Sequence, residues 1–232
     1  MIKTEKTFAV HQPNFIPWIG YFDKISKSDI FIILDEVQYP RGKSIANRNK
    51  ICNRNGEILE IVAPVSIPKG FDSKVPYENV LLANKLWYKK ALKTIEYSYK
   101  RADYFDEVFE LVSVPLKNDG FCEMNISFIR NVCEYLNFKT NIILQSELGD
   151  IGGNKSSLIA ALGMHMGAST YLSGKGAMVY NDEELYQKKG IKLTYQEFNH
   201  PIYNQHCPNF LPNLSIIDLL FFYGHEAKLF FQ

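Results

Sequence analysis

The feature that most constrains this chain is a regular alternation between short apolar runs and longer amphipathic runs. The apolar runs have the length of β-strands and lie at 7–10, 30–34, 141–144, 170–172 and 192–195. The amphipathic runs place apolar residues at helical spacing and lie at 19–28, 155–166 and 182–189. Strands that alternate with helices form right-handed βαβ units with parallel strands. The sequence therefore predicts an α/β fold with a mostly parallel sheet flanked by helices, Rossmann-like.

A second set of segments interrupts this alternation. One further strand is predicted at 57–62, and three consecutive runs with helical spacing follow at 84–101, 104–117 and 125–136. The polar stretch 41–55 and the proline-rich stretch 64–76 carry no predicted element. The apolar tail at 214–222 and 225–231 is predicted to be buried helix. We therefore expect a single α/β domain over 1–232, with a helical insertion at about 84–137.

Charge and composition exclude several classes of protein. The 26 basic and 25 acidic side chains give a net charge of +1, so no electrostatic attraction to nucleic acid or to an anionic membrane is expected. With 46% hydrophobic residues the chain can bury a core, which excludes intrinsic disorder. The four cysteines form no CxxC pair, so we expect free thiols and neither a zinc site nor a disulfide framework.

The start of the chain and its apolar runs bear on localisation. Charged residues within the first six positions leave no apolar core for a secretory signal. Apolar runs such as 30–34 stop far short of the roughly 20 residues that a membrane helix needs. We therefore expect a cytoplasmic protein with no membrane insertion.

Polar side chains gather where the predicted parallel strands end. Ligands of such sheets bind beyond the carboxyl ends of the strands, in segments that begin here at His11, Asp35, Ser146, Ser173 and Gln196. The most unusual segment is HQPNFIPWIGYFDKI, residues 11–25, which leads into a helix whose first N–H groups suit an anion. His11 can donate to a phosphate or act as an acid or base, while Gln12 and Asn14 can orient a ligand and Lys24 can hold an anion. In the alternative interpretation His11 caps the turn and Lys24 is solvated.

Three other segments carry candidate ligand groups, each with a structural alternative. Asp35 follows the second strand and can hold a metal or accept from sugar hydroxyls, or it can simply terminate the strand. Asn47 and Arg48 suit a carboxylate or a phosphate and are equally at home in a solvated turn. Ser173 and Gly174 open a glycine-rich loop that can approach a phosphate, although the loop is not a Walker motif.

Late polar residues offer a different set of candidates. The segment HPIYNQH, residues 200–206, gathers two imidazoles, a phenol and two amides. Two histidines on a loop do not fix the geometry of a metal site, so no metal is predicted. Asp218 can serve as a base, and its spacing from Ser215 equally fits a capping box that starts a helix. The chain contains neither a GxSxG motif nor a Cys-His signature of a covalent nucleophile.

Several stretches, taken together and in order, resemble the WbqC-like family. They are HQPNFIPWIGYFDKI, DEVQYPRG, NRNKI, SELG, TYLSGKG, YQEFNHPIYNQ and PNLSIIDLLFFYG, and they cover the chain from about Phe8 to Gly224. The resemblance implies a bacterial cytoplasmic protein associated with O-antigen or other surface-polysaccharide biosynthesis, and a group-transferring enzyme. The opening also resembles the nucleotidylyltransferase and pantothenate-synthetase group, whose first turn faces the nucleotide phosphates. This resemblance implies a nucleotidylyltransferase-like arrangement as one candidate for the fold. Asn14 stands where that group has a second histidine.

Matching positions in these motifs supply the predicted site. The predicted catalytic residues are His11 and Asp35. The predicted substrate-binding residues are Gln12, Asn14, Tyr21, Lys24, Gln38, Tyr39, Asn47, Arg48, Ser173, Gly174, Tyr203 and Gln205. At Lys175 the resembling family more often has proline, so Lys175 receives no role.

The leading hypothesis is transfer of an acyl or aminoacyl group to the amine of a nucleotide-linked amino sugar, with the nucleotide held at the His11 turn. Amide formation needs a proton acceptor and a stabilised oxyanion, which imidazole and N–H donors provide. The alternatives are ATP-dependent adenylation or nucleotidyl transfer, and a non-catalytic assembly factor for polysaccharide synthesis. No tightly bound cofactor is expected, and ATP or a thioester is the candidate donor. The expected partner is a nucleotide-linked sugar or another small anionic substrate, and a homo-oligomer stays open.

Overall fold

The computed structural model describes residues 5–40, 44–68, 74–205, 207 and 209–231. By its internal contacts the chain divides into two units. The first unit comprises 1–12, 23–35 and 139–199, and the second comprises 13–22, 36–138 and 200–232. The interpretation of 1–232 as a single domain with a helical insertion stays a prediction.

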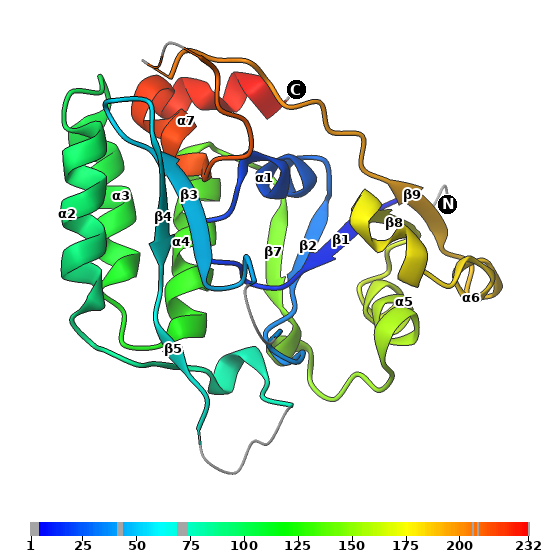
Figure 1. Ribbon diagram of the computed structural model, residues 1–232. Helices are drawn as coiled ribbons and strands as arrows, with labels where there is room; N and C mark the ends of the chain where they lie inside the picture. The colour runs from blue at the N-terminus through cyan, green and yellow to red at the C-terminus, as the bar shows by residue number, and fades with distance from the viewer. Residues whose placement is uncertain (1–4, 41–43, 69–73, 206, 208, 232) are drawn as a thin grey trace. The chain divides into compact units, whose positions relative to one another are not determined.

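A five-stranded parallel sheet forms the centre of the first unit. In the order in which they lie, its strands are β7 (Asn141–Leu144), β2 (Ile30–Ile33), β1 (Thr7–His11), β8 (Thr170–Ser173) and β9 (Lys192–Tyr195) (Figure 1). Every neighbouring pair is parallel. Numbered by their position in the chain, the strands run 3-2-1-4-5, the order of dinucleotide-binding α/β folds. The predicted α/β fold, a parallel sheet flanked by helices, is confirmed.

Buried apolar residues explain why these strands form. All four residues of β2 are buried, and so are Phe8, Ala9 and Val10 of β1, which is typical of strands covered on both faces. The helices of this unit include α5 (Lys155–His165) and α6 (Glu183–Lys188), and 3-10 helices follow β7 and β8 at Gln145–Leu148 and Lys175–Tyr180. The N-cap of α6 is Asp182, whose Oδ1 accepts from the N–H of Leu185 at 3.0 Å. The helix predicted at 182–189 therefore begins one residue later than predicted, at Glu183.

Two small antiparallel sheets and several helices make up the second unit. Strand β3 (Arg48–Cys52) pairs with β4 (Ile58–Val62), and β5 (Val65–Ser66) pairs with β6 (Leu81–Leu82). The α-helices are α2 (Trp87–Tyr99), α3 (Phe105–Leu116), α4 (Phe121–Tyr135) and α7 (Ile216–Tyr223), with 3-10 helices at Tyr77–Asn79 and Gly224–Phe231. Helix α1 (Ile19–Ser26) contributes residues to both units. The helices predicted over 84–136 and 214–222 are confirmed within a few residues.

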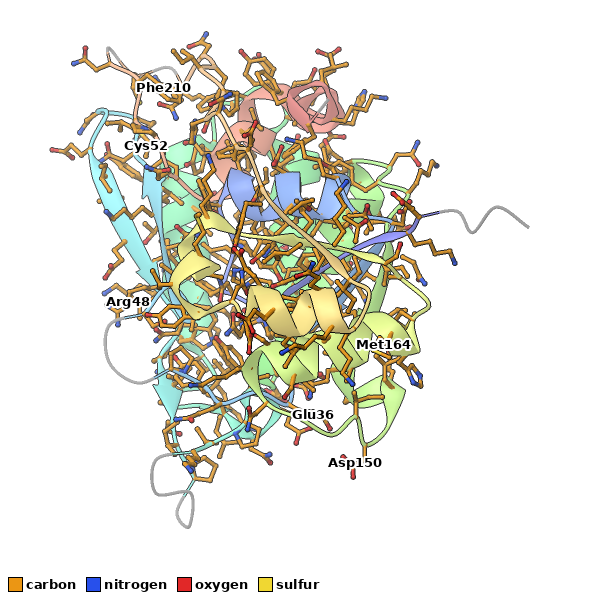
Figure 2. All side chains as sticks on the ribbon, turned by 90° about the vertical axis from the view of Figure 1, so that its right-hand side faces the viewer. Glu36, Arg48, Cys52, Asp150, Met164 and Phe210 are labelled. Atoms are coloured by element: carbon orange, nitrogen blue, oxygen red, sulfur yellow. The ribbon has the colours of Figure 1, made fainter. Side chains whose placement is uncertain are left out.

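Strand β3 lies within 41–55, where polarity predicts no element. Only Ile51 and Cys52 of this strand are buried, so it lacks the alternating apolar pattern of a strand. Its pairing with β4, with Asn49 opposite Ile61 and Ile51 opposite Leu59, supplies the stability that the local sequence lacks. Figure 2 labels Arg48 and Cys52, the first and last residues of β3. Strand β5 likewise lies in a stretch without a predicted element.

Aromatic rings fill part of the core of the second unit. Tyr99 of α2 stacks on Phe221 of α7 with ring centroids 4.3 Å apart and planes at 13°. Phe105 of α3 stacks on the same phenylalanine with centroids 5.9 Å apart. One ring therefore joins three helices. None of the described helices, these included, has the length and apolar character needed to cross a bilayer.

The packing of the first unit can be tested with Gly163→Ala in α5. A Cβ at this position would lie 2.3 Å from the Phe8 ring, which already stacks on Tyr171 with centroids 5.1 Å apart. Alanine normally stabilises a helix over glycine by up to about 1 kcal/mol, but overpacking here should lower the free energy of unfolding by about 1–3 kcal/mol. Chemical denaturation measures the change. The control is Gly152→Ala, where nothing lies within 4 Å of the added Cβ; equal losses at the two positions would contradict this packing.

Candidate functional site

The carboxyl edge of the parallel sheet carries the residues predicted for the first unit. Strand β1 ends at His11 and β8 at Ser173, and Asp35 follows β2. Strands β1 and β8 are neighbours, and from them the strand order runs outward in opposite directions to β7 and to β9. Ligands of α/β sheets bind outside the carboxyl ends at such a switch point. The ends of β1 and β8 are therefore the candidate site of the first unit.

Burial controls the charge of the two basic side chains near this edge. The Lys24 side chain donates from Nζ to the Val10 carbonyl oxygen at 3.0 Å, and burial lowers the pKa of Lys24 from 10.5 to about 7. The His11 Nδ1 lies 3.1 Å from the Gln12 carbonyl oxygen. Burial, followed by the positive charge of Lys24, lowers the pKa of His11 from 6.5 to about 3. At neutral pH His11 is therefore uncharged and can accept a proton, while Lys24 exchanges between its two charge states.

Asp35 and Ser173 hold the loops at this edge. The Asp35 carboxylate, 4% exposed, accepts from the Ser146 hydroxyl at 2.6 Å and from the Ser146 N–H at 3.1 Å. The fully buried Ser173 hydroxyl accepts from Asn181 Nδ2 at 3.0 Å. Gly174 then precedes the 3-10 helix at Lys175–Tyr180. These contacts position the loops after β7 and β8, and the catalytic role of Asp35 stays a prediction.

In the second unit, the turn at 13–18 has a strained backbone. Ile16 is fully buried and has a φ of 34°, a region that β-branched residues rarely occupy. Its carbonyl oxygen accepts two hydrogen bonds, from Asn49 Nδ2 at 2.8 Å and from Ser215 Oγ at 2.7 Å. Such strain persists only where the surrounding structure over-determines it. The turn, β3 and the start of α7 therefore meet at one carbonyl group.

Further hydrogen bonds hold both flanks of this turn. Each joins a backbone group of the turn to a segment distant in sequence: Asn125 Nδ2 to the Pro13 carbonyl at 2.9 Å, the Phe15 N–H to the Ala46 carbonyl at 3.0 Å, and the Ile216 N–H to the Pro17 carbonyl at 2.8 Å. The two prolines have no N–H, so their carbonyl groups are their sole backbone anchors. A fixed backbone therefore presents the side chains between them.

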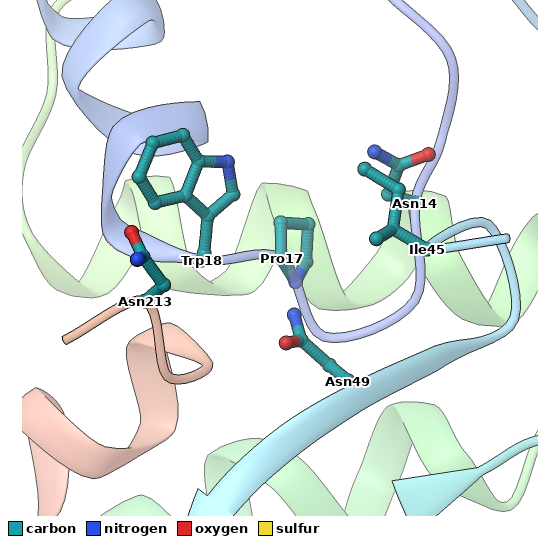
Figure 3. Close-up of a pocket in the computed structure, with 6 residues that line it drawn as sticks. All are labelled: Asn14, Pro17, Trp18, Ile45, Asn49 and Asn213. Carbon is teal, nitrogen blue, oxygen red and sulfur yellow. The ribbon is translucent and has the colours of Figure 1, made fainter. Parts of the chain in front are cut away.

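This turn lines an open pocket of about 300 Å³ (Figure 3). We call it the Trp18 pocket, and its lining residues are Asn14, Pro17, Trp18, Ile45, Asn49 and Asn213. Figure 3 shows Pro17 and Trp18 projecting to the same side of the turn, with Asn49 of β3 pointing toward Pro17. A Cβ at Gly20 would lie 2.5 Å from the Trp18 ring, so glycine is needed for the indole to take this place.

Amide groups supply the polar part of this pocket. Asn14 is 5% exposed, and within the described ranges its amide has no hydrogen-bond partner. The Asn49 amide donates to Ile16 and accepts from the Lys50 N–H at 2.8 Å, which fixes its orientation. A pocket with an apolar wall, one aromatic face and a few oriented amides suits a small molecule that has hydroxyl groups around an apolar ring face. A sugar ring has such a surface.

His200 supports the other side of this pocket. Its Nε2 accepts from the N–H of Asn213 at 3.0 Å, and Asn213 has a φ of 62°, which asparagine tolerates better than most residues. His206, the second histidine of that segment, lies outside the described residues. Among the residues that the structure describes, no three His, Cys, Asp or Glu side chains gather to hold a metal ion.

Four other predicted residues belong to the second unit, of which three are buried and Gln38 is exposed. Tyr21 and Tyr39 are 2% and 5% exposed, and burial raises the pKa of both phenols. The backbone of Gln38 forms a bridge to Pro76. The Asn47 amide donates to the Ala63 carbonyl at 2.9 Å. None of these four is among the described residues that line the Trp18 pocket.

Arg48 and Gln205 each bind a neighbour. The Arg48 Nη1 lies 3.2 Å from Glu60 Oε2 across the β3–β4 pair. This ion pair is partly exposed and contributes less than about 1 kcal/mol, so an anion could displace it. The Gln205 amide donates to the Leu211 carbonyl at 2.9 Å and accepts from the Leu211 N–H at 2.7 Å. Gln205 therefore shapes its own loop.

A buried carboxylate lies elsewhere in the second unit. Asp218 is fully buried and accepts from the Tyr99 hydroxyl at 2.6 Å and from the Tyr203 hydroxyl at 2.9 Å. Burial raises the pKa of Asp218 from 3.8 to about 6, while these hydrogen bonds act in the opposite direction. Ser215 caps α7 by accepting from the Ile217 N–H at 3.4 Å, whereas the Asp218 side chain binds the tyrosines instead of completing a capping box. Tyr203, a predicted substrate ligand, therefore supports Asp218.

Of the six described residues that line the Trp18 pocket, sequence reasoning predicted Asn14 as a ligand and missed the other five, Trp18 and Asn213 among them. Trp18 stands in the unusual stretch 11–25, so its type and position offered a signal. Asn213 carries no local signal, because folding alone brings it to the turn at 13–18. Of the predicted ligands, Asn14 lines this pocket, while in the first unit the charge of Lys24 helps to lower the pKa of His11.

The charge state of His11 gives a pH-dependent prediction. Because the pKa of His11 is about 3 in the folded chain and 6.5 in the unfolded chain, protonation favours unfolding. The stability that neutral His11 contributes is complete above pH 6.5 and is lost as the pH falls toward 3. As the pH falls through this window, wild type should lose free energy of unfolding relative to His11→Gln, by up to about 1.4 kcal/mol per pH unit. Urea denaturation from pH 7 downward measures it, with Gln12→Asn as a control that should give a flat difference.

The Asp218 cluster gives a second prediction. Tyr99→Phe and Tyr203→Phe each remove a donor from a buried carboxylate, which should lower the free energy of unfolding by about 1.5–3 kcal/mol at pH 8. The loss should be smaller at pH 5, below the pKa of about 6, because the protonated carboxyl is no longer charged. Urea denaturation at both pH values measures the losses. Tyr97→Phe on the same helix, where the side chain is 54% exposed, is the control; losses independent of pH would show that Asp218 is not the group involved.

Comparison with known proteins identifies relatives of the whole chain. The model of the WbqC-like protein family matches residues 12–229. A Mycobacterium tuberculosis (strain ATCC 25618 / H37Rv) protein named "Uncharacterized protein Rv1507c" is 30% identical over 226 residues, which cover 96% of each chain. No solved structure matches the chain. The chain therefore belongs to the WbqC-like protein family.

Proposed function

We propose that this protein is an enzyme of bacterial surface-polysaccharide (O-antigen) biosynthesis that transfers an acyl or aminoacyl group to the amine of a nucleotide-linked amino sugar. The observation that carries the proposal is the Trp18 pocket. A sugar ring packs its C–H face on an indole and directs its hydroxyl groups to amides. Asn14 offers a buried amide without an internal partner within the described ranges, and a hydroxyl group would satisfy it.

Groups of the first unit support the transfer chemistry. The amine attacks the acyl carbon, the C–N bond forms, the bond to the leaving group breaks, and the amine loses a proton. His11 is the proposed acceptor of that proton: it is uncharged at neutral pH, and its pKa of about 3 in the free protein has to rise when the substrate binds. The strand order supports binding of a nucleotide at the ends of β1 and β8. Asp35 acts as a positioning residue through Ser146.

The same strand order favours a second candidate, ATP-dependent adenylation of a carboxylate. This reaction releases pyrophosphate, whereas transfer from a thioester does not. Pyrophosphate release from ATP and a carboxylic acid, without any amino sugar, would assign adenylation. A third reading, a non-catalytic assembly factor, requires that the sugar binds and that no donor yields product.

Calorimetry with UDP- and dTDP-linked amino sugars tests the pocket. Trp18→Ala should weaken binding by at least about tenfold, the equivalent of about 1.4 kcal/mol. Gly20→Ala should also weaken binding while keeping the indole, because its Cβ would lie 2.5 Å from the ring and displace it. Tyr180→Ala removes a ring that is 77% exposed in the first unit and should leave binding unchanged.

Turnover is followed by mass spectrometry with a panel of acyl thioesters, and with ATP plus carboxylic acids. His11→Gln should lower the rate of product formation while binding changes by less than about twofold, the equivalent of about 0.4 kcal/mol. Equal binding by wild type, Trp18→Ala and Gly20→Ala would remove the sugar assignment of this pocket. If the sugar binds but no donor in the panel yields a product of higher mass, the non-catalytic assembly factor is the remaining candidate.

A further inference from the structure

Two of the four cysteines meet in the second unit although they are 155 residues apart in sequence. The Cys52 Sγ lies 2.7 Å from the Cys207 Sγ. Cys52, labelled in Figure 2, ends β3 and is 3% exposed, whereas Cys207 is partly exposed. A reagent from solution can therefore reach one sulfur, with the second directly behind it.

Neighbouring groups hold both thiols in place. The Cys52 thiol also lies 3.2 Å from the Asn53 carbonyl oxygen, and the Cys207 thiol lies 3.2 Å from the Gln205 carbonyl oxygen. The Cys52 N–H donates to the Tyr99 hydroxyl at 3.2 Å. A disulfide requires sulfur atoms about 2.05 Å apart, so closure needs a movement of less than about 1 Å. The backbone on the β3 side is already anchored for this closure.

We propose that Cys52 and Cys207 are a site of reversible oxidative modification, at which a hydroperoxide converts the two thiols to a disulfide. The proposal is independent of the proposed function. The Cys207 thiolate attacks one oxygen of the peroxide, the O–O bond breaks, and Cys207 becomes a sulfenic acid as the peroxide is reduced. The Cys52 sulfur then attacks Cys207 Sγ, the S–O bond breaks, and the hydroxyl leaves as water with the Cys52 proton. Two thiols and one hydrogen peroxide thus give one disulfide and two waters.

Exposure sets the order of these steps. The pKa of Cys52 is raised, first by burial and then by the hydrogen bond and the charge of Cys207. The Cys52 sulfur therefore stays protonated until it attacks the sulfenic acid on Cys207. Cys207 is the accessible member and reacts first. The remaining cysteines, Cys122 and Cys133, are both buried on α4 and lie roughly 16 Å apart along its axis, so they cannot bond to each other.

The disulfide would connect β3 to the segment that supplies Tyr203 and Gln205. Tyr99, which accepts from Cys52, and Tyr203 are the two donors to Asp218. Oxidation would therefore restrain both partners of this carboxylate. A crosslink between residues 155 positions apart also lowers the conformational entropy of the unfolded chain. The oxidised protein should therefore melt roughly 5–15 °C higher than the reduced protein.

Thiol counting and peptide mapping on the full chain test the proposal. Counted after denaturation, the reduced protein should show four thiols, and two when the folded protein is first treated with one equivalent of hydrogen peroxide. A digest without reductant should contain one crosslinked peptide pair, Cys52 with Cys207, and dithiothreitol should restore four thiols. Retention of four thiols, a bond to Cys122 or Cys133, or a crosslink between chains would overturn the proposal.

Single variants assign the steps. Cys52→Ser should leave a sulfenic acid on Cys207 that dimedone traps, and Cys207→Ser should resist the same dose of peroxide. Cys133→Ala is the matched control and should still form the Cys52–Cys207 bond. Dimedone labelling of Cys52 in the Cys207→Ser variant would reverse the assigned order and contradict the mechanism. If either serine variant fails to fold, the wild-type peptide map decides alone.

Discussion

The Trp18 pocket depends on the two hydrogen bonds that the Ile16 carbonyl oxygen accepts. Asn49 of β3 and Ser215 before α7 donate to it at 2.8 and 2.7 Å, and they hold a buried isoleucine at a φ of 34°. An unsupported isoleucine would leave this conformation, because its Cβ crowds the following carbonyl group. With both donors present, the backbone between the two prolines of the turn is held and the indole lies over Gly20. The strain is thus stored where a ligand would bind.

Burial, more than ion pairing, sets the charge of the functional groups. In the first unit it lowers the pKa of Lys24 to about 7 and that of His11 to about 3, so neither side chain carries a fixed positive charge at neutral pH. In the second unit it raises the pKa of Asp218 to about 6, although two tyrosine hydroxyls donate to the carboxylate. Groups whose charge changes near neutral pH suit proton transfer, and groups with a fixed charge suit anion binding. Lys24, whose charge changes near neutral pH, therefore fits a chemical step better than a permanent phosphate clamp, and His11 has no positive charge at neutral pH with which to hold a phosphate.

Polar residues of the predicted motifs divide into two kinds when their contacts are known. Asn47, Arg48 and Gln205 each bind a neighbouring residue of the second unit. Asn14 keeps an amide free of partners within the described ranges and faces a pocket. Residue type cannot separate these kinds, because an amide that pairs with a backbone carbonyl and one that awaits a ligand have the same chemistry. The same is true of the cysteines, of which only Cys52 and Cys207 are known to meet.

The sequence by itself determined the α/β class, because strands buried on both faces and helices buried on one leave local patterns. It also marked 11–25 as the unusual stretch and placed His11, Asp35 and Ser173 at strand ends. Tertiary structure alone decided that β3 is a strand, since its polar residues depend on pairing with β4. It likewise decided that Asn213 joins Trp18 and that Cys52 meets Cys207. The physical reason is the same in each case: contacts between distant segments depend on how the whole chain packs, and they impose no periodicity on the residues that make them.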